Sequence, residues 1–361
     1  GTGGSVVLSL APALQSTKVW TSSIASNVAN FAANTGGSAN SPAWSATAPA
    51  AASSTIVQVT AGNTVLLKKE TFSVGTATSY TTTRSCSSTN LPSDLNGQND
   101  ATLIIAAADA GKLILCTYTN ALLPATIQTA KVWSGTTRST DIAKIAATSG
   151  TGAISTPGGT GFTSTAGSAV VGATVVFPAE TFSGTPGLAA NYLTTFACTG
   201  NTNAPTGGGG NGQNSHNLVI AAADSGKTIV CSYTNTLKTA ALTLNKTWSN
   251  ATLNDVVNVT ATGLTALSST ANPVSKTDTG SAQTVRAGDV IVIAENFTTG
   301  ASGNYTSALS CTGTSGLSGS TLTVGATDTN ISCGYTNTRK TALLTLNKTW
   351  SNATLNDVVN V

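Results

Sequence analysis

Apolar and polar residues alternate along most of this chain, with the period of two that is typical of β-strands. Between positions 242 and 248, for example, Leu242, Leu244 and Trp248 alternate with threonine and asparagine, so these apolar side chains share one face of a predicted strand. Clusters of Gly, Ser, Thr, Asn and Asp separate such short segments. Roughly seven predicted strands make up one unit of the pattern, which indicates an all-β sandwich.

The pattern recurs along the chain as an internal repeat. A lysine two residues before a tryptophan occurs at positions 18, 131, 246 and 348, and residues 242–259 return unchanged as 344–361. The sequence therefore predicts an N-terminal extension strand at 1–13, β-sandwich repeats at 14–122, 123–238 and 239–340, and the first strands of a fourth repeat at 341–361.

The junction between successive repeats has a constant length. Eleven positions separate the asparagine near the end of one repeat from the next lysine, from 120 to 131, from 235 to 246 and from 337 to 348. Such a short connection leads each last strand almost directly into the next first strand, so we expect the repeats to form an extended, stiff rod. The segment Ser5–Ala11 is an extra strand without an assigned partner. Because an unpaired strand can complete a neighbour's sheet, we expect copies to associate into a filament.

Each repeat places three polar residues on strand faces that are otherwise apolar. Lys246, for example, shares its face with Leu244 and Trp248, because alternate residues of a strand point to the same side. A buried charge is costly unless it is paired or neutralised, so a set that recurs in three repeats needs a reason. The sets are Lys18, Glu70 and Asn120, then Lys131, Glu180 and Asn235, and then Lys246, Glu295 and Asn337. The tryptophans beside the lysines are expected to be core residues that shield the amine.

The three residue types together can form a covalent bond. Burial favours the neutral forms of a lysine amine and of a carboxylic acid. A neutral Lys131 could attack the side-chain amide of Asn235, with Glu180 relaying protons, to give an isopeptide bond and ammonia without any cofactor. In this scheme the glutamates are the autocatalytic residues of all three sets. The alternative is a buried lysine–glutamate ion pair that is hydrogen-bonded to the asparagine, with no covalent bond.

The six cysteines fall two to a repeat, and the second of each pair always lies two residues before a tyrosine of the last strand. Their spacing does not suit clustered zinc ligands. The expected pairs are Cys86–Cys116, Cys198–Cys231 and Cys311–Cys333, one disulfide within each repeat. Disulfides indicate a location outside the cytoplasm. Buried free thiols are the alternative.

Charge and composition exclude several function classes. Only 8% of the residues are charged and the net charge is +3, without a cluster of Lys or Arg, so we expect no nucleic-acid partner. No apolar run approaches the length of a membrane span. The one histidine, His216, lies in a Gly- and Asn-rich segment without a nucleophilic serine motif, which argues against a hydrolase. Acidic residues are too few for calcium motifs, so no metal or cofactor is expected.

The order of motifs resembles a known family. Lys-x-Trp is followed by Ala-Gly or Val-Gly leading to Glu-x-Phe, then by Asn-Tyr and a cysteine, and finally by Cys-x-Tyr-Thr-Asn. This order resembles the prealbumin-like repeat domains of bacterial surface proteins, which are related to the collagen-adhesin B-type domains of pilins. The resemblance covers all three repeats. It implies a transthyretin-like (immunoglobulin-like) sandwich whose first and last strands are neighbours, joined through lysine and asparagine, with a catalytic glutamate on a middle strand. The disulfide on the last strand departs from the pilin pattern, and no cell-wall sorting motif is visible.

Two functions remain after these exclusions. The first is a structural subunit of an extracellular bacterial filament, stalk or surface fibre, which forms homopolymers and has at most autocatalytic activity. The second is an adhesin stalk or binding module that presents a ligand-binding region to a host or carbohydrate, for which Trp44 is the modest candidate. Both place the chain at the cell surface.

Overall fold

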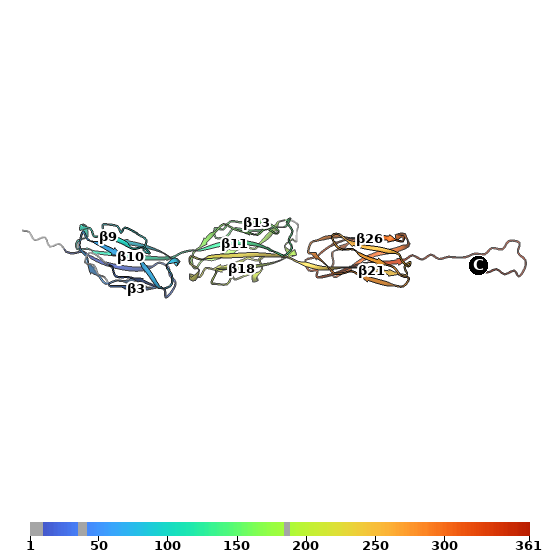
Figure 1. Ribbon diagram of the computed structural model, residues 1–361, viewed down its shortest axis with the longest axis horizontal. Coiled ribbons are helices and arrows are strands. Elements are labelled where there is room, and N and C mark those ends of the chain that lie inside the picture. The colour runs from blue at the N-terminus through green and yellow to red at the C-terminus, as the bar shows by residue number, and fades with distance from the viewer. Residues whose placement is uncertain (1–9, 35–41, 184–187) are drawn as a thin grey trace, which may run out of the picture. The chain divides into compact units, whose positions relative to one another are not determined.

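The computed structural model describes residues 10–34, 42–183 and 188–361 (Figure 1). Over these residues the chain forms β-strands and short 3-10 turns, and no α-helix. The prediction of an all-β fold is therefore confirmed. The strands form three groups, each built from strands that follow one another in the sequence, as the blue, green and orange-to-red colours of Figure 1 show.

The first group lies between residues 13 and 122. Its strands are β1 (Ala13–Trp20), β2 (Val28–Phe31), β3 (Trp44–Thr47), β4 (Ala52–Ser53), β5 (Val57–Gln58), β6 (Thr64–Leu67), β7 (Glu70–Val74), β8 (Tyr80–Cys86), β9 (Ala101–Ile104) and β10 (Leu113–Leu122). One sheet has the order β4-β1-β10-β8, with β5 also paired to β1. The others are β3-β2-β7 and β6-β9.

The second group repeats this arrangement between residues 125 and 237. Its strands are β11 (Ala125–Ser134), β12 (Ile142–Ile145), β13 (Ile154–Pro157), β14 (Phe162–Thr163), β15 (Gly167–Ala169), β16 (Thr174–Phe177), β17 (Thr181–Ser183), β18 (Tyr192–Thr199), β19 (His216–Val219) and β20 (Thr228–Leu237). The sheets are β14-β11-β20-β18 with β15 on β11, then β13-β12-β17, and then β16-β19.

The third group has the same first sheet and a more continuous second one. Its strands are β21 (Thr239–Ser249), β22 (Val256–Ala261), β23 (Leu267–Thr270), β24 (Lys276–Thr279), β25 (Gln283–Arg286), β26 (Val290–Thr299), β27 (Tyr305–Thr312), β28 (Leu317–Ser318), β29 (Thr321–Thr323) and β30 (Asn330–Arg339). The sheets are β24-β21-β30-β27 with β25 on β21, and β23-β22-β26-β29-β28.

The chain divides into two compact units, residues 1–184 with 194–235 and residues 185–193 with 236–361. Most of the first two strand groups belong to the first unit, and the third group belongs to the second unit. The predicted repeat limits, 14–122, 123–238 and 239–340, and the rod stay predictions.

Alternate residues of the first and last strands fill each core, as the period-two pattern predicts. Along β21, the face that carries Leu242, Leu244 and Trp248 is buried, and every intervening residue is partly exposed. Leu14 and Ile114 occupy the corresponding faces of β1 and β10. Burial of such side chains stabilises the sandwich by about 1.5–3 kcal/mol each.

The expected strands at 341–361 are not formed. These residues contain turns but no strand, and Leu344 is 78% exposed where its counterpart Leu242 is buried. The reason is the lack of partners. β21 pairs with β24, β25 and β30, and no copies of these three strands follow residue 344 in this sequence. A strand whose partners are missing cannot bury its apolar face.

The expected extension strand at 1–13 lies mostly outside the described residues. Leu10 and Ala11 belong to no strand, and Ala13 is already the first residue of β1. That Ser5–Ala11 is an unpaired strand which completes a neighbour's sheet therefore stays a prediction.

Candidate functional site: a buried lysine, glutamate and asparagine

The lysine and the asparagine of each set lie on the first and last strands, which are neighbours. In the first repeat β1 runs parallel to β10, and Trp20 lies opposite Asn120. In the third repeat Trp248 lies opposite Asn337 in the same way. The lysine precedes its tryptophan by two residues on the same strand face, so it is a diagonal neighbour of the asparagine. In the second repeat the first and last strands, β11 and β20, are likewise neighbours.

The glutamates reach the sites from the other sheets. Glu70 is the first residue of β7, Glu180 directly precedes β17, and Glu295 lies in the middle of β26. The structure thus brings together every lysine, glutamate and asparagine that the sequence predicts.

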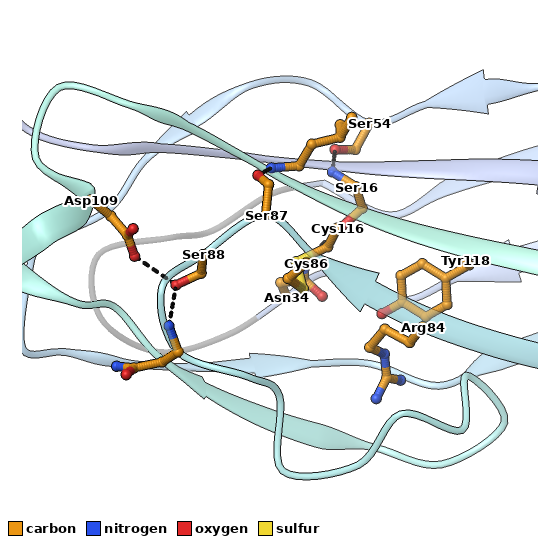
Figure 2. The surroundings of a disulfide bond; sticks show 12 residues. Ser16, Asn34, Ser54, Arg84, Cys86, Ser87, Ser88, Asp109, Cys116 and Tyr118 are labelled. Carbon is orange, nitrogen blue, oxygen red and sulfur yellow. Dashed lines mark hydrogen bonds between the residues drawn. A yellow bond between two sulfur atoms is a disulfide. The ribbon is translucent and has the colours of Figure 1, made fainter.

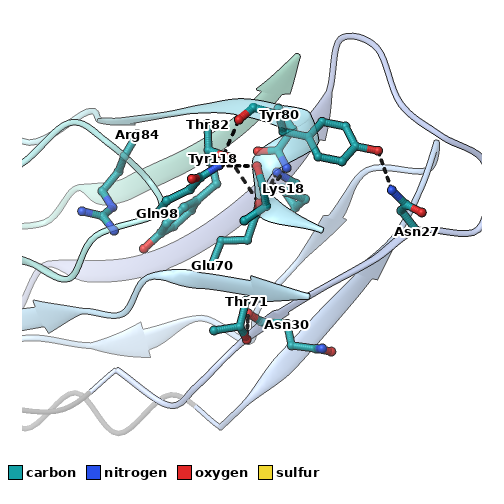
Figure 3. A network of polar contacts seen from close by, with 12 residues as sticks. Lys18, Asn27, Asn30, Glu70, Thr71, Tyr80, Thr82, Arg84, Gln98 and Tyr118 are labelled. Carbon is teal, nitrogen blue, oxygen red and sulfur yellow. Dashed lines mark hydrogen bonds and ion pairs between the residues drawn. The ribbon is translucent and has the colours of Figure 1, made fainter. Parts of the chain in front are cut away.

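In the first repeat one carboxylate contacts both partners. Lys18 Nζ lies 2.5 Å from Glu70 Oε2 (Figure 3). Asn120 Nδ2 donates to Glu70 Oε1 at 2.7 Å. The side chains of Lys18 and Glu70 are 0% exposed. Because each carboxylate oxygen serves a different partner, Glu70 bridges the amine and the amide.

In the second repeat the glutamate also contacts both partners, but through a single carboxylate oxygen. Lys131 Nζ lies 3.5 Å from Glu180 Oε1, and Asn235 Nδ2 donates to the same oxygen at 2.6 Å. Lys131 also donates to the backbone carbonyls of Val132 at 3.0 Å and Tyr233 at 3.1 Å. Within the described part of the chain, Glu180 Oε2 has no hydrogen-bond partner.

The third repeat again uses both carboxylate oxygens. Lys246 Nζ lies 3.4 Å from Glu295 Oε2, and Asn337 Nδ2 donates to Glu295 Oε1. The copy of this lysine at Lys348 is exposed, and its Nζ donates to the backbone carbonyl of Thr349. The segment 341–361 therefore carries the lysine without the rest of the site.

Burial changes the protonation of these groups. It lowers the pKa of Lys18, Lys131 and Lys246 to about 8, although the neighbouring glutamate opposes the change in each case. Burial also raises the pKa of Glu180 above its usual value. Both shifts in the second repeat favour the neutral amine and the protonated carboxyl, the forms that nucleophilic attack on an amide requires.

The asparagine amides are oriented alike in all three repeats. Each Nδ2 faces the glutamate, and the Oδ1 atoms of Asn120, Asn235 and Asn337 are buried and accept no hydrogen bond from any described residue. The amide nitrogen would be the leaving group in isopeptide formation. The glutamate is therefore placed to give that nitrogen a proton.

A tryptophan ring covers each lysine amine. The distances from Nζ to the ring centroid are 4.4 Å for Lys18, 4.6 Å for Lys131 and 4.3 Å for Lys246. Trp248 is fully buried, and Trp20 and Trp133 are half-buried. The expected role of these rings, shielding the amine from water, agrees with this placement.

The tyrosine after each second cysteine also belongs to the site, which the sequence analysis missed. Its hydroxyl donates to the backbone carbonyl two residues before the glutamate, from Tyr118 at 2.8 Å, Tyr233 at 2.6 Å and Tyr335 at 3.2 Å. These bonds tie the glutamate segment to the last strand. The signal in the sequence was the invariant spacing of Cys-x-Tyr-x-Asn in the three repeats.

The cysteines are joined in the expected pairs, Cys86–Cys116, Cys198–Cys231 and Cys311–Cys333. Figure 2 shows the first disulfide, which links directly paired residues of β8 and β10. Nearby, Ser88 donates to the buried carboxylate of Asp109 at 2.6 Å, which fixes the turn before β10. The disulfide and the lysine set thus act on the same last strand.

Other candidate sites have a structural explanation. His216 is not in a loop, as the sequence suggested, but begins β19, where it is buried and stacks on Phe196 at 4.1 Å. Among the described residues, no group of three or more His, Cys, Asp or Glu side chains could hold a metal ion. No helix in the described part of the chain is long and apolar enough to cross a membrane.

Several solved structures show low similarity to the chain. The Bacillus anthracis TIE protein is 10% identical with a TM-score of 0.39, covering 91% of this chain and 51% of its own. The major pilin protein (T-13) of Streptococcus pyogenes is 12% identical with a TM-score of 0.29, covering 61% of this chain and 98% of its own. The pilus adhesin SpaC of Lactobacillus rhamnosus GG is 9% identical with a TM-score of 0.23, and the match covers 92% of this chain and 44% of the adhesin.

The chain therefore spans about half the length of the Bacillus anthracis protein. No curated protein sequence shows significant similarity to the chain.

One protein family does match the sequence. Residues 12–122 and 128–237, together more than half of the chain, match the prealbumin-like fold domain. These stretches coincide with the first two strand groups, and the third group has the same first sheet and the same buried set. The chain belongs to the prealbumin-like fold domain family, with at least two such domains in tandem.

Proposed function

We propose that the chain is a structural subunit of an extracellular bacterial surface fibre, in which a lysine–asparagine isopeptide bond closes each repeat. One observation carries the proposal: in each of three repeats a buried glutamate contacts both the lysine Nζ and the asparagine Nδ2. A site repeated in every domain strengthens the whole chain, whereas a site for substrate would need only one copy.

The bond would form in one balanced exchange. The neutral Nζ of Lys131 attacks Cγ of Asn235, so that an Nζ–Cγ bond forms and the Cγ–Nδ2 bond breaks. Glu180 takes a proton from Nζ and gives one to Nδ2, which leaves as ammonia. The products are a secondary amide and one ammonia, and the carboxyl returns to its starting state. No cofactor or oxidant takes part, because the fold holds the reacting groups in contact.

Intact-mass analysis tests this chemistry. After reduction of the disulfides, the wild-type chain should weigh less than its sequence by one ammonia for each bond, three in all. Glu180→Gln keeps the shape of the side chain but cannot relay protons, so it should restore one ammonia to the mass. Peptide mapping should show that only the Lys131–Asn235 link is lost. A reduced wild-type mass equal to that of the sequence would contradict the proposed bonds.

The location outside the cytoplasm rests on the three disulfides, since such bonds persist in oxidising compartments. Self-association into a fibre is part of the proposal. Microscopy of the native material, labelled with an antibody to this chain, should show label along continuous fibres. Label confined to a distinct head on isolated stalks would instead support an adhesin.

The adhesin alternative has one specific candidate residue, Trp44. Its ring stacks on Phe31 with centroids 4.2 Å apart, and Phe31 in turn contacts Tyr118. Trp44 is thus part of the packing of the first repeat. This packing favours the structural subunit over the adhesin.

A further inference from the structure

The strand beside the last strand supplies a hydroxyl to the site in two of the three repeats. β8, β18 and β27 each begin with a tyrosine, and the residue two positions later is Thr82, Thr194 or Ser307. Thr82 lies directly opposite Asn120, and Ser307 directly opposite Asn337. This position therefore lies beside the reacting asparagine on the same face of the sheet, on the neighbouring strand that does not carry the lysine.

In the first repeat the hydroxyl is held on the carboxylate. Thr82 Oγ1 donates to Glu70 Oε1 at 3.3 Å, as the close-up of Figure 3 shows. Gln98 Nε2 donates to the same Oγ1 at 3.2 Å and to the carbonyls of Ala77 and Tyr80, each at 3.0 Å. Because Gln98 can only donate through this nitrogen, the Thr82 oxygen accepts, and its own proton is directed to Glu70.

In the third repeat the same hydrogen bond is present, but its donor is exposed to solvent. Ser307 Oγ donates to Glu295 Oε2 at 3.4 Å. Ser307 is exposed, whereas Thr82 is buried. Water can replace an exposed hydroxyl, so the hydrogen bond from Ser307 matters less than the one from Thr82.

In the second repeat the threonine hydroxyl makes its hydrogen bond to a residue other than the glutamate. Thr194 Oγ1 donates to Asn211 Oδ1. Both Lys131 and Asn235 then use Glu180 Oε1, and no described residue donates a hydrogen bond to Oε2. The amine of Lys131 is also engaged by two backbone carbonyls. The carboxylate is thus held by fewer contacts in this repeat than in the other two.

We propose that Thr82, and to a smaller extent Ser307, is a positioning residue that orients the glutamate between lysine and asparagine, and that the second repeat, which lacks this contact, closes more slowly than the first. This inference rests on the proposed isopeptide chemistry. A hydrogen bond to a charged group contributes enough to transition-state placement for an effect of about tenfold in rate.

The test follows bond formation in the full-length chain. The chain is made by cell-free synthesis under oxidising conditions, sampled over time and digested, and the linked peptide of each repeat is quantified by mass spectrometry. In the wild type the Lys18–Asn120 link should form before the Lys131–Asn235 link. Thr82→Val should slow only the first link, about tenfold. Thr82→Ser keeps the hydroxyl and should close at the wild-type rate.

Two matched controls come from the chain itself. Thr194→Val removes the corresponding hydroxyl of the second repeat and should leave the Lys131–Asn235 rate unchanged. Thr81→Val alters the exposed neighbour of Thr82 and should change nothing. Thr82→Ser separates positioning from packing, because it keeps the donor to the carboxylate and removes only a methyl group.

The outcomes distinguish the two proposals. If the wild type forms no linked peptide in any repeat, the isopeptide chemistry itself is refuted. If all three links form but Thr82→Val closes as fast as the wild type, the positioning role is refuted. If Thr82→Val fails to form the Cys86–Cys116 disulfide, the variant is misfolded and the test uses the wild type alone. There the rates of the Lys18–Asn120 and Lys131–Asn235 links are compared, and equal rates overturn the inference.

Discussion

At the scale of single residues, the buried lysines are the feature that most needs a physical reason. Lys18, Lys131 and Lys246 are at most 1% exposed. Taking an ion pair out of water often costs as much free energy as the attraction between the two charges provides. Apolar residues of similar size often stabilise a core equally well. A purely non-covalent pair therefore does not explain why the same three residues occur in every repeat. A covalent bond between lysine and asparagine, which would persist when the repeat unfolds, does explain it.

The pH dependence of stability should distinguish free from linked lysines. Burial lowers the pKa of Lys131 to about 8 in the folded state, from its ordinary value of 10.5. Between these values the unfolded state binds more protons, so stability rises with pH in this window and is level below it. In Asn235→Ala the amine stays free, and the free energy of unfolding of the second repeat should rise between pH 8 and 9.5. Urea denaturation at several pH values measures this.

A linked lysine has no amine to titrate, so the wild-type second repeat should lack that rise. Adding Lys131→Met to Asn235→Ala removes the amine and should abolish the rise, which is the control. The same slope in the wild type and in Asn235→Ala would mean that the wild-type lysine is free.

The residues of the site could be read from the sequence because each breaks the period-two pattern. Lys246, Glu295 and Asn337 stand on faces where apolar residues are expected, and the structure buries them there. Thr82 and Tyr118 could not be found in this way, because threonine and tyrosine are ordinary strand residues. Their roles depend on which atoms lie across the sheet.

At the scale of elements, the last strand holds the site together. It carries the cysteine, the tyrosine and the asparagine at successive positions of one face, as Cys231, Tyr233 and Asn235 show in β20. The disulfide fixes this strand to β18, and the tyrosine fixes it to the glutamate segment. The position of the glutamate therefore depends on a hydrogen bond to the backbone.

Tyr233→Phe should weaken this element. It removes the donor to the carbonyl of Pro178 and leaves a part-buried acceptor unpaired, which costs about 1–3 kcal/mol. We expect a loss of that size in the unfolding free energy of the second repeat and slower formation of the Lys131–Asn235 link. Denaturant unfolding and peptide mapping measure the two effects. Thr195→Ala, at an exposed position of β18, is the control, and an equal loss in both variants would contradict the role of the tyrosine.

Strand boundaries were harder to predict than strand identity. β26 runs without a break from Val290 to Thr299, whereas the corresponding part of the second repeat is divided into β16 and β17. Pro178 lies in that gap, and proline cannot donate to a strand ladder. In the first repeat Lys68 and Lys69 occupy the gap, and neither sequence pattern nor propensity signals a break there.

At the scale of the whole molecule, the repeat was visible in the sequence because lysine, cysteine and asparagine recur in one order. The all-β class and the neighbouring first and last strands followed from that order and are seen in the structure. The conformation of residues 341–361 could not be predicted from that order. Identical residues form most of β21 and most of β22 in one place and no strand in the other, because pairing partners decide whether a strand forms.

The parallel pairing of first and last strands determines how each repeat should respond to force. Tension enters at the start of β1 and leaves at the end of β10, and a Lys18–Asn120 bond lies between these points. The bond would carry the force, so the residues between 18 and 120 should stay folded. In the triple variant Glu70→Gln, Glu180→Gln and Glu295→Gln, pulled in reductant, each repeat should instead release about 100 residues, or about 350 Å of chain. Single-molecule pulling measures these steps. Asn120→Ala should release the first repeat alone, and steps of full length in the wild-type chain would show that its strands are joined by hydrogen bonds only.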